Sequence, residues 1–327
     1  YLLLRGWREL AGETEFGLRA FSTLSGIVLV ALAYSLGRQM SGAMGRGAAI
    51  IGAFLLAVNP ALIYYSQETR MYELLGLLTL LSTLLLVHYL QSSSRRAGPA
   101  AGYVIVVAAG LYTHYFFPAV VLAQNVVYGI WLYGRRENGR AALWREARAW
   151  LLMMVVALLL YLPWLPIMFR QAGNRPGGRL DPVSFLHEAV AWLASGPTLP
   201  VEATTLTLLV YGLLIVDGVF LGLRVRRRGL SYPATLLPLA LIPLLTMWLV
   251  GATQPAYFKF LLAIIPPLCL LAGAGWWWGW FGKSGSTSEP PVASPGYILE
   301  RGIRRPILIV LALVVLWGSF QSLRNMY

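Results

Sequence analysis

The sequence predicts an all-α protein, a polytopic bundle of about ten transmembrane helices. Its residues are 58% hydrophobic and 12% charged, and the mean hydropathy is +0.66, a balance that a water-soluble domain does not keep. Apolar segments of roughly 15 to 23 residues recur along the chain, close to the length that crosses a hydrocarbon core of about 30 Å. Runs such as Ile307 to Leu316 are continuously apolar, which predicts helices because the strands of a membrane barrel alternate apolar and polar residues.

The expected spans follow one another with polar connections. In order they are residues 17–37, 47–66, 71–91, 100–114, 116–133, 149–169, 203–223, 232–250, 259–281 and 305–323. Only the polar stretch Tyr112 to Tyr115 separates the fourth span from the fifth. This spacing predicts two helices that meet in a tight turn.

The charge distribution predicts an orientation in the membrane. Most of the 26 Lys and Arg residues lie in alternate connections, which the positive-inside rule assigns to the cytoplasm, and most acidic residues lie on the other side. We therefore expect a multi-pass protein of the cytoplasmic membrane whose active face is periplasmic or extracellular. The net charge is +13, and the basic residues responsible for it lie between apolar spans. There they favour membrane lipids as partners and not nucleic acid.

We expect a single transmembrane domain over residues 1–327. Its longest outer loop, residues 170–202, contains the stretch Pro182 to Leu193, which is typical of an interfacial helix. The chain opens abruptly on Tyr1-Leu2-Leu3-Leu4 and closes just past a span. These ends favour a chain that is shortened at its N-terminus, with a shortened C-terminus as a further alternative.

No cofactor is expected. The single cysteine, Cys269, lies in an apolar segment, and His88, His114 and His187 lie in separate segments without metal-ligand spacing. A divalent metal stays an open alternative.

The stretch from Asn59 to Glu73 is the most informative polar segment. A span ends there and the next begins, with Ser66 placed to cap the new helix and Glu68 in its first turn. Arg70 and Glu73 are neighbours at helical spacing, so an interfacial ion pair is one interpretation. The other is a functional site, because charges close to the hydrocarbon are costly.

Three further motifs follow along the chain. They are the turn Leu111 to Phe116, the span exit Leu162-Pro163-Trp164, and the segment Tyr257 to Phe260, which leads to Pro266-Pro267. Together with the pattern over residues 59–72, they resemble the polytopic GT-C glycosyltransferases. The resemblance is to the bacterial branch related to protein O-mannosyltransferases and aminoarabinose transferases, and it covers nearly the whole chain.

The resemblance implies a GT-C-like fold and the transfer of a sugar from a polyprenyl-phosphate donor to a glycan, lipid or protein acceptor on the outer face, with inversion and with phosphate leaving. In the family the catalytic base is an Asp in the first outer loop. The opening Tyr1 to Trp7 is similar to the segment just after that loop, so the base is expected upstream of Tyr1. Glu68 is the remaining weak candidate for a base within the chain.

The substrate-binding candidates are Arg70, Lys259, Glu68, Tyr72, His114 and Gln67. Arg70 and Lys259 are the choices for the donor phosphate, because cations at the outer boundary suit an anionic headgroup. The family more often has Arg where Lys259 stands, and snorkelling of Lys259 to the interface is an equal alternative. For His114 and Tyr72, a structural role in the turn or in an aromatic belt is the alternative.

Two other classes of protein stay open. A transporter or lipid flippase would explain Asp217, an acidic residue deep in a span, which we otherwise expect to be a protonated or hydrogen-bonded structural residue. A non-catalytic membrane subunit would explain the missing Asp.

Overall fold

The computed structural model describes residues 2–41, 45–92, 97–172, 180–224, 230–281 and 295–326. Over these ranges the chain forms helices and turns and no strand, which confirms the predicted all-α class. The α-helices are α1 (Leu2–Ala11), α2 (Glu15–Ser41), α3 (Gly45–Ala57), α4 (Pro60–Ser66), α5 (Tyr72–Gln91), α6 (Ala97–Thr113), α7 (Phe117–Tyr133), α8 (Arg140–Tyr161), α9 (Leu165–Ala172), α10 (Pro182–Ser195), α11 (Thr205–Arg224), α12 (Tyr232–Leu249), α13 (Ile265–Phe281) and α14 (Pro295–Arg324). The 3₁₀ helices are η2 (Arg136–Asn138), η3 (Leu162–Trp164), η4 (Val201–Thr204) and η5 (Pro255–Ile264).

The helices agree with the expected spans. Within the described ranges, 6 helices are long and apolar enough to cross a membrane, and the bent pair 46–57 and 60–66 makes a seventh if it is one span. Together with three shorter apolar helices, 97–113, 117–133 and 308–324, these account for every span that the sequence predicts. The protein is therefore a multi-pass membrane protein.

The expected span 47–66 is not one straight helix. It is divided into α3 and α4, whose axes differ by 57°. The break falls at Asn59, which is extended (φ −68°, ψ 123°), and α4 begins with Pro60. The proline ring cannot continue the preceding helix because it lacks an N–H and collides with the preceding turn.

Other helices begin earlier than the apolar pattern suggests, among them α14, which begins at Pro295 where the span is expected from residue 305. The span expected at 149–169 begins at Arg140, after Gly139 in a positive-φ conformation (86°), and ends through η3 and α9. The span expected at 259–281 begins with the 3₁₀ helix η5 and continues as α13. The polar first turns of α8 carry no hydropathy signal, which is why hydropathy alone places its start too late.

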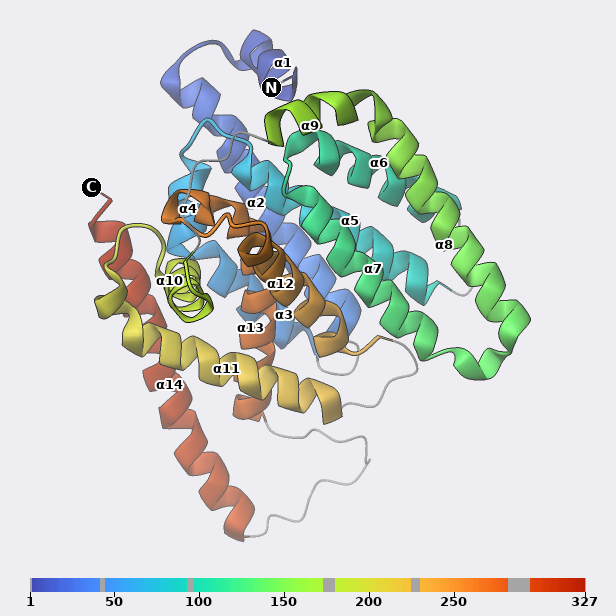
Figure 1. Cartoon of the computed structure of the whole chain (residues 1–327). Helices are drawn as coiled ribbons and strands as arrows, with labels where there is room; N and C mark the ends of the chain where they lie inside the picture. Colours follow the sequence, from blue (N-terminus) through green and yellow to red (C-terminus); the bar gives the residue numbers. More distant parts are fainter. Residues whose placement is uncertain are drawn as a thin grey trace.

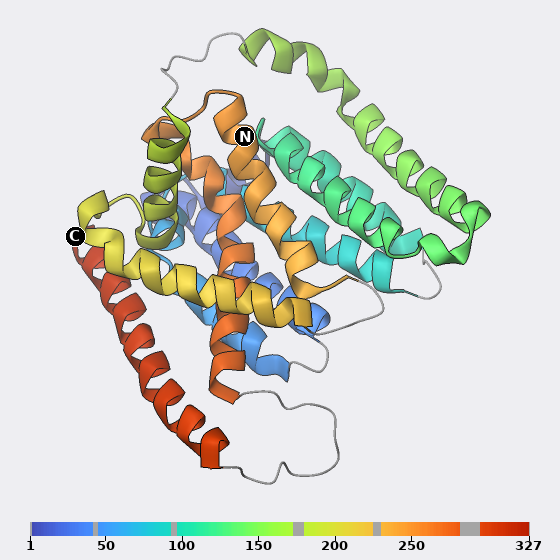
Figure 2. The same ribbon diagram turned by 60° about the horizontal axis from the view of Figure 1, so that its bottom comes forward.

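Helix α13 lies at the centre of the bundle, surrounded by α2, α3, α11 and α12 (Figure 1). Its residues Leu270, Leu271 and Ala274 are completely buried. In contrast, α8 runs along one side outside α6 and α7, and α14 runs along the opposite side (Figure 2). The core is therefore organised around α13, and α8 is peripheral.

Glycines allow α13 to approach its neighbours closely. A Cβ added at Gly275 would overlap the carbonyl oxygen of Leu214 in α11, and one added at Gly218 would overlap that of Leu271. On another side, a Cβ at Gly273 would overlap the backbone of Gly52 in α3. Small residues at helix crossings are typical of membrane bundles, where close packing replaces a hydrophobic driving force.

Hydrogen bonds of Asn59 connect α4 to α10 and hold the short helix α4, which precedes loop 67–71. The Asn59 side chain accepts hydrogen bonds from the N–H groups of Ala61 (3.0 Å) and Leu62 (3.2 Å). Its amide donates to the carbonyl of Leu193 in α10 (2.9 Å). Asn59 is 1% exposed, so the two helices are joined by a buried polar side chain.

We expect Asn59→Ala to lower the free energy of unfolding by about 2–4 kcal/mol, because it removes a helix cap and leaves a buried carbonyl unpaired. Thermal unfolding of the purified protein in detergent measures the loss. Asn59→Ser is the control, since it retains the capping oxygen and lacks only the donor to Leu193. A larger loss for the serine variant than for alanine would contradict the capping role.

The segment Pro182 to Leu193 lies within helix α10, as expected from the sequence. Asp181 caps this helix, because its carboxylate accepts from the N–H groups of Val183 (3.0 Å) and Ser184 (3.1 Å). The hydrogen bond from the Ser184 side chain, followed by those from the backbone, lowers the pKa of Asp181. Interfacial placement of α10 stays a prediction.

Candidate functional site

The loop 67–71 carries three of the candidate site residues, Gln67, Glu68 and Arg70, and α2 holds it in place. The hydroxyl of Ser22 lies 2.6 Å from the carbonyl oxygen of Glu68 and 3.1 Å from that of Arg70. The neighbouring Thr23 donates to the carbonyl of Ser66 (3.0 Å). Ser22 is 1% exposed, so this anchor is shielded from solvent.

We expect Ser22→Ala to increase the hydrogen exchange of the loop 67–71 amides by about fivefold, because one net hydrogen bond contributes about 1 kcal/mol. Hydrogen–deuterium exchange of the purified protein measures this. Ser35→Ala is the matched control, since the Ser35 hydroxyl bonds only to Ala31 of its own helix. Equal exchange in both variants would show that Ser22 does not anchor the loop.

Two details of this loop differ from the sequence prediction. Ser66 does not cap α5: it is the last residue of α4, and its hydroxyl donates to the carbonyl of Ile63 (2.8 Å). Helix α5 begins at Tyr72 after Met71, which makes no side-chain capping bond, so Glu68 lies before the helix and not in its first turn. Residues 67–71 form a loop of turns and bends between α4 and α5.

Tyr72 is the centre of an aromatic cluster at this end of the bundle. Its ring centroid lies 5.5 Å from that of Tyr65, 6.1 Å from that of His114 and 6.3 Å from that of Phe260. The His114 and Phe260 rings are 4.4 Å apart. These contacts bring together the start of α5, the turn between α6 and α7, and η5, which we call the site end of the bundle.

His114 is positioned by the turn in which it lies. The sequence predicts this turn, and the structure confirms it, with α6 ending at Thr113 and α7 beginning at Phe117. The Nδ1 atom of His114 accepts from the N–H of Phe116 (3.1 Å). In the neutral ring the proton then belongs to Nε2, so that nitrogen is the one able to donate to a ligand.

Lys259 lies on η5 with its Nζ atom 5.3 Å from the Tyr72 ring centroid, in the range of a cation–π contact. The side chain is half-buried, and it forms no ion pair within the described ranges. Arg70, two residues before Tyr72, is exposed and likewise has no carboxylate partner among the residues described. The site end therefore offers two cations without a counter-charge from the described chain.

Glu73 is the residue at this end whose burial the sequence did not predict. It is completely buried, and neither carboxylate oxygen has a hydrogen-bond partner among the described residues. A Cβ added at Gly26 of α2 would meet its Oε2 at 3.4 Å. The predicted alternative of an Arg70–Glu73 ion pair is therefore wrong, because Arg70 is exposed while Glu73 points into the helix interface.

Asp217 is also placed differently from the expectation. It is exposed on α11 and makes no hydrogen bond or ion pair with the part of the chain that the structure describes. The hydrogen-bonded alternative therefore finds no support among the described residues, and a protonated structural residue stays a prediction. The sequence of α11 could not predict the exposure of Asp217. Apolar residues surround this helix, so they do not mark which face lies against a neighbour.

The described residues contain no group of three or more His, Cys, Asp and Glu side chains that could hold a metal ion. At the site end, His114 and Glu68 come from separate loops and do not form such a group.

Comparisons with known proteins identify the fold. The apo crystal structure of ArnT from Cupriavidus metallidurans superposes with a TM-score of 0.61 at 16% identity, over 98% of this chain and 64% of that chain. The structure of ArnT bound to undecaprenyl phosphate gives a TM-score of 0.55 at 16% identity, over 99% of this chain and 63% of that one. The chain thus spans less than two thirds of the length of the ArnT structures it matches.

An archaeal protein is similar as well. The oligosaccharyltransferase AglB from Archaeoglobus fulgidus, in complex with an inhibitory peptide and a dolichol-phosphate, gives a TM-score of 0.58 at 12% identity, over 96% of this chain and 45% of that chain. At these identities the likeness concerns the fold alone. A search of curated protein sequences finds no match.

The bundle is similar in fold to these polytopic GT-C membrane proteins, as the sequence motifs predicted. A family model narrows this class. Residues 1–167 match the model of the dolichyl-phosphate-mannose-protein mannosyltransferases, and the chain belongs to that family.

Proposed function

We propose that the protein transfers a sugar from a polyprenyl-phosphate donor to an acceptor hydroxyl at the site end, on the outer face of the cytoplasmic membrane. The observation that carries the proposal is the pair of uncompensated cations, Arg70 and Lys259, on two segments joined through Tyr72. An anionic phosphate that arrives in the lipid leaflet needs this kind of charge at the membrane boundary. Two of the similar structures are complexes with undecaprenyl phosphate and with a dolichol-phosphate, which supports a donor of this class.

The proposed reaction inverts the anomeric carbon. The acceptor oxygen forms a bond to that carbon while the bond to the phosphate oxygen breaks, and the electron pair leaves with the phosphate. The acceptor proton passes to a carboxylate base. Arg70 and Lys259 stabilise the negative charge that develops on the leaving phosphate, which is the electrostatic contribution that such a step requires.

The other candidates receive binding roles. His114, through Nε2, donates to a sugar hydroxyl or to the phosphate, and Tyr72 offers its ring edge or hydroxyl beside Lys259. Gln67 and Glu68 orient the donor or the acceptor from the anchored loop. We do not assign deprotonation to Glu68, because only its backbone N–H and carbonyl are held by hydrogen bonds, and no described contact aims its carboxylate.

The test is sugar release from a panel of radiolabelled polyprenyl-phosphate sugars, in membranes that contain the full-length protein. We expect turnover with one donor class, and loss of turnover for Lys259→Gln while Lys259→Arg keeps most of it. Glu68→Gln is expected to reduce the rate less than about tenfold, whereas removal of a true base costs about 10²–10⁴-fold.

Absence of turnover with every donor, from protein shown to be folded, would overturn the proposal. It would favour a transporter or flippase, or a non-catalytic subunit. A loss of 10²-fold or more for Glu68→Gln would instead make Glu68 the base.

A further inference from the structure

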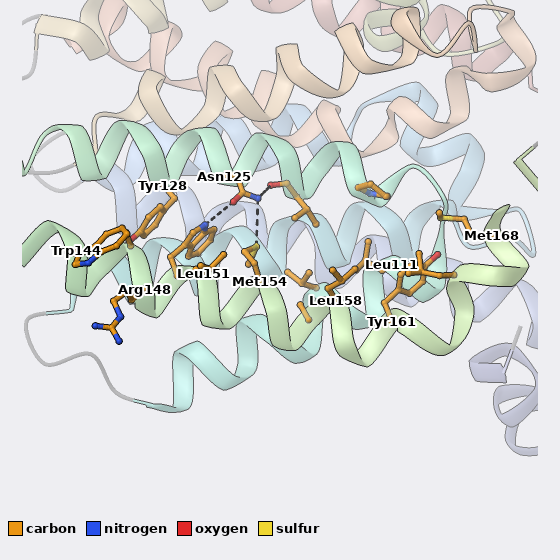
Figure 3. Close-up of a pocket in the computed structure, with 17 residues that line it drawn as sticks. Leu111, Asn125, Tyr128, Trp144, Arg148, Leu151, Met154, Leu158, Tyr161 and Met168 are labelled. Carbon is orange, nitrogen blue, oxygen red and sulfur yellow. Dashed lines mark hydrogen bonds between the residues drawn. The ribbon is translucent and has the colours of Figure 1, made fainter.

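A long crevice lies between α7 and the peripheral helix α8, on the flank of the bundle (Figure 3). Its volume is about 720 Å³. Its walls include Val107 and Leu111 of α6, Val121 of α7, and Leu151, Met154 and Leu158 of α8. Leu151 and Leu158 are more than half exposed, so the crevice opens to the surroundings of the bundle, which in a membrane are lipid chains.

The amide of Asn125 in the crevice walls is engaged by neighbouring groups. Asn125 donates to the carbonyl of Val121 (2.8 Å) and accepts from the indole N–H of Trp150 (2.8 Å). The Trp150 ring stacks on Tyr128 with centroids 4.2 Å apart and the planes nearly parallel. The walls therefore offer hydrocarbon and aromatic surface, which suits an apolar chain and not a polar ligand.

One mouth of the crevice is strongly basic. Trp144 and Arg148 line it near the start of α8, and both are exposed (Figure 3). The other end of α8 lies at the site end, because the Tyr112 hydroxyl beside the turn of His114 donates to the carbonyl of Leu160 (2.9 Å). The segment 134–148 carries five Arg and two Glu. The Arg135 and Arg136 guanidinium groups stack on Trp131 and Tyr133, at 4.3 and 4.4 Å from the ring centroids. Arg148 has no ion-pair partner within the described ranges.

The length of the crevice fits one leaflet. From Arg148 to Leu158 helix α8 rises about 15 Å, at 1.5 Å per residue, and half of a hydrocarbon core is also about 15 Å. A chain that enters beside Arg148 therefore reaches Leu158 at the depth where a leaflet ends. The basic mouth supplies charge complementarity for an anionic headgroup, and Trp144 lies where interfacial tryptophans anchor.

We propose that this crevice is a binding site for an anionic glycerophospholipid, with one acyl chain between α7 and α8 and the phosphate beside Arg148. The occupant differs from the sugar donor, because the mouth lies at the opposite end of the bundle from Arg70 and Lys259. A donor phosphate cannot occupy both ends at once.

The test is native mass spectrometry of the full-length protein after incubation with phosphatidylglycerol or phosphatidylcholine of the same acyl chains. The parent protein is expected to retain phosphatidylglycerol about fivefold better, the effect of one basic side chain near an anionic lipid. Arg148→Gln should abolish this preference. Arg38→Gln is the matched control, since it removes an exposed arginine from the same end of the bundle, and it should keep the preference.

Ala147→Trp tests the proposed acyl-chain site separately, because the larger side chain fills the crevice beside the mouth. It should reduce retention of both lipids at an unchanged melting temperature. Equal retention of the two lipids by the parent protein, or an equal loss for Arg38→Gln and Arg148→Gln, would overturn the proposal. Displacement of phosphatidylglycerol by an equimolar polyprenyl phosphate would also overturn it and assign the crevice to the tail of the donor.

Discussion

Arg70→Ala is expected to lower kcat/KM for the polyprenyl-phosphate sugar by about 10²–10³-fold, the usual loss when one preorganised group that stabilises developing charge is removed. Arg70 is exposed at the site end, and its backbone is fixed through Ser22, so the guanidinium is free to meet a phosphate from the leaflet. Steady-state kinetics with the donor identified in the panel measure the effect.

Two variants separate this role from a general loss of charge. Arg70→Lys should recover part of the rate, since it restores the charge but not the bidentate geometry of a guanidinium. Arg19→Ala removes an exposed arginine near the start of α2, the end of that helix that lies beside loop 67–71. Because Arg19 is already paired with Glu15, its loss should have little effect on the rate. If Arg19→Ala and Arg70→Ala reduce the rate equally, the phosphate site at Arg70 is wrong.

Much of the fold could be predicted from the sequence because lipid restricts the choices. A chain in hydrocarbon must satisfy its backbone internally, so each long apolar run becomes a helix, and the runs at 71–91 and 232–250 match α5 and α12 within a residue or two. The bend at Asn59 could not be predicted from hydropathy. Pro60 ends the preceding helix, but α4 is also held by the buried Asn59 amide, which contacts α10 at a residue 134 positions away in the chain.

The sequence predicted part of the grouping of residues at the site end. Tyr72, His114 and Lys259 were chosen from separate segments, and the structure brings these three together through ring contacts and a cation–π contact. The roles of all candidates stay proposals. The sequence did not reveal Ser22, because a serine in an apolar helix carries no pattern that says which loop it faces.

Glu73 shows the limit of spacing arguments. Its position three residues after Arg70 suggests a helical ion pair, yet Arg70 lies before α5 begins and only Glu73 lies within it. A shift of a helix start by a few residues changes which side chains are neighbours. Element boundaries, which sequence patterns define least well, therefore decide the site geometry here.

The crossing of α11 and α13 gives the largest expected effect on stability. Gly275→Ala should lower the free energy of unfolding by about 3 kcal/mol or more, because the new Cβ overlaps a backbone carbonyl of α11 that no rotamer change can move. Overpacking of this kind must separate the two helices, and α13 is the buried centre of the bundle. Thermal unfolding in detergent, together with the yield of folded protein, measures the effect.

Gly212→Ala is the matched control for this prediction, since Gly212 lies on α11, one of the two crossing helices, and a Cβ added there meets nothing within 4 Å. Alanine is favoured over glycine in a helix by about 1 kcal/mol, so this variant should be neutral or more stable. The two substitutions are chemically identical and differ only in what the methyl group meets. Opposite signs would therefore show that close backbone approach, and not helix propensity, holds α11 against α13, whereas equal shifts would contradict the glycine crossing.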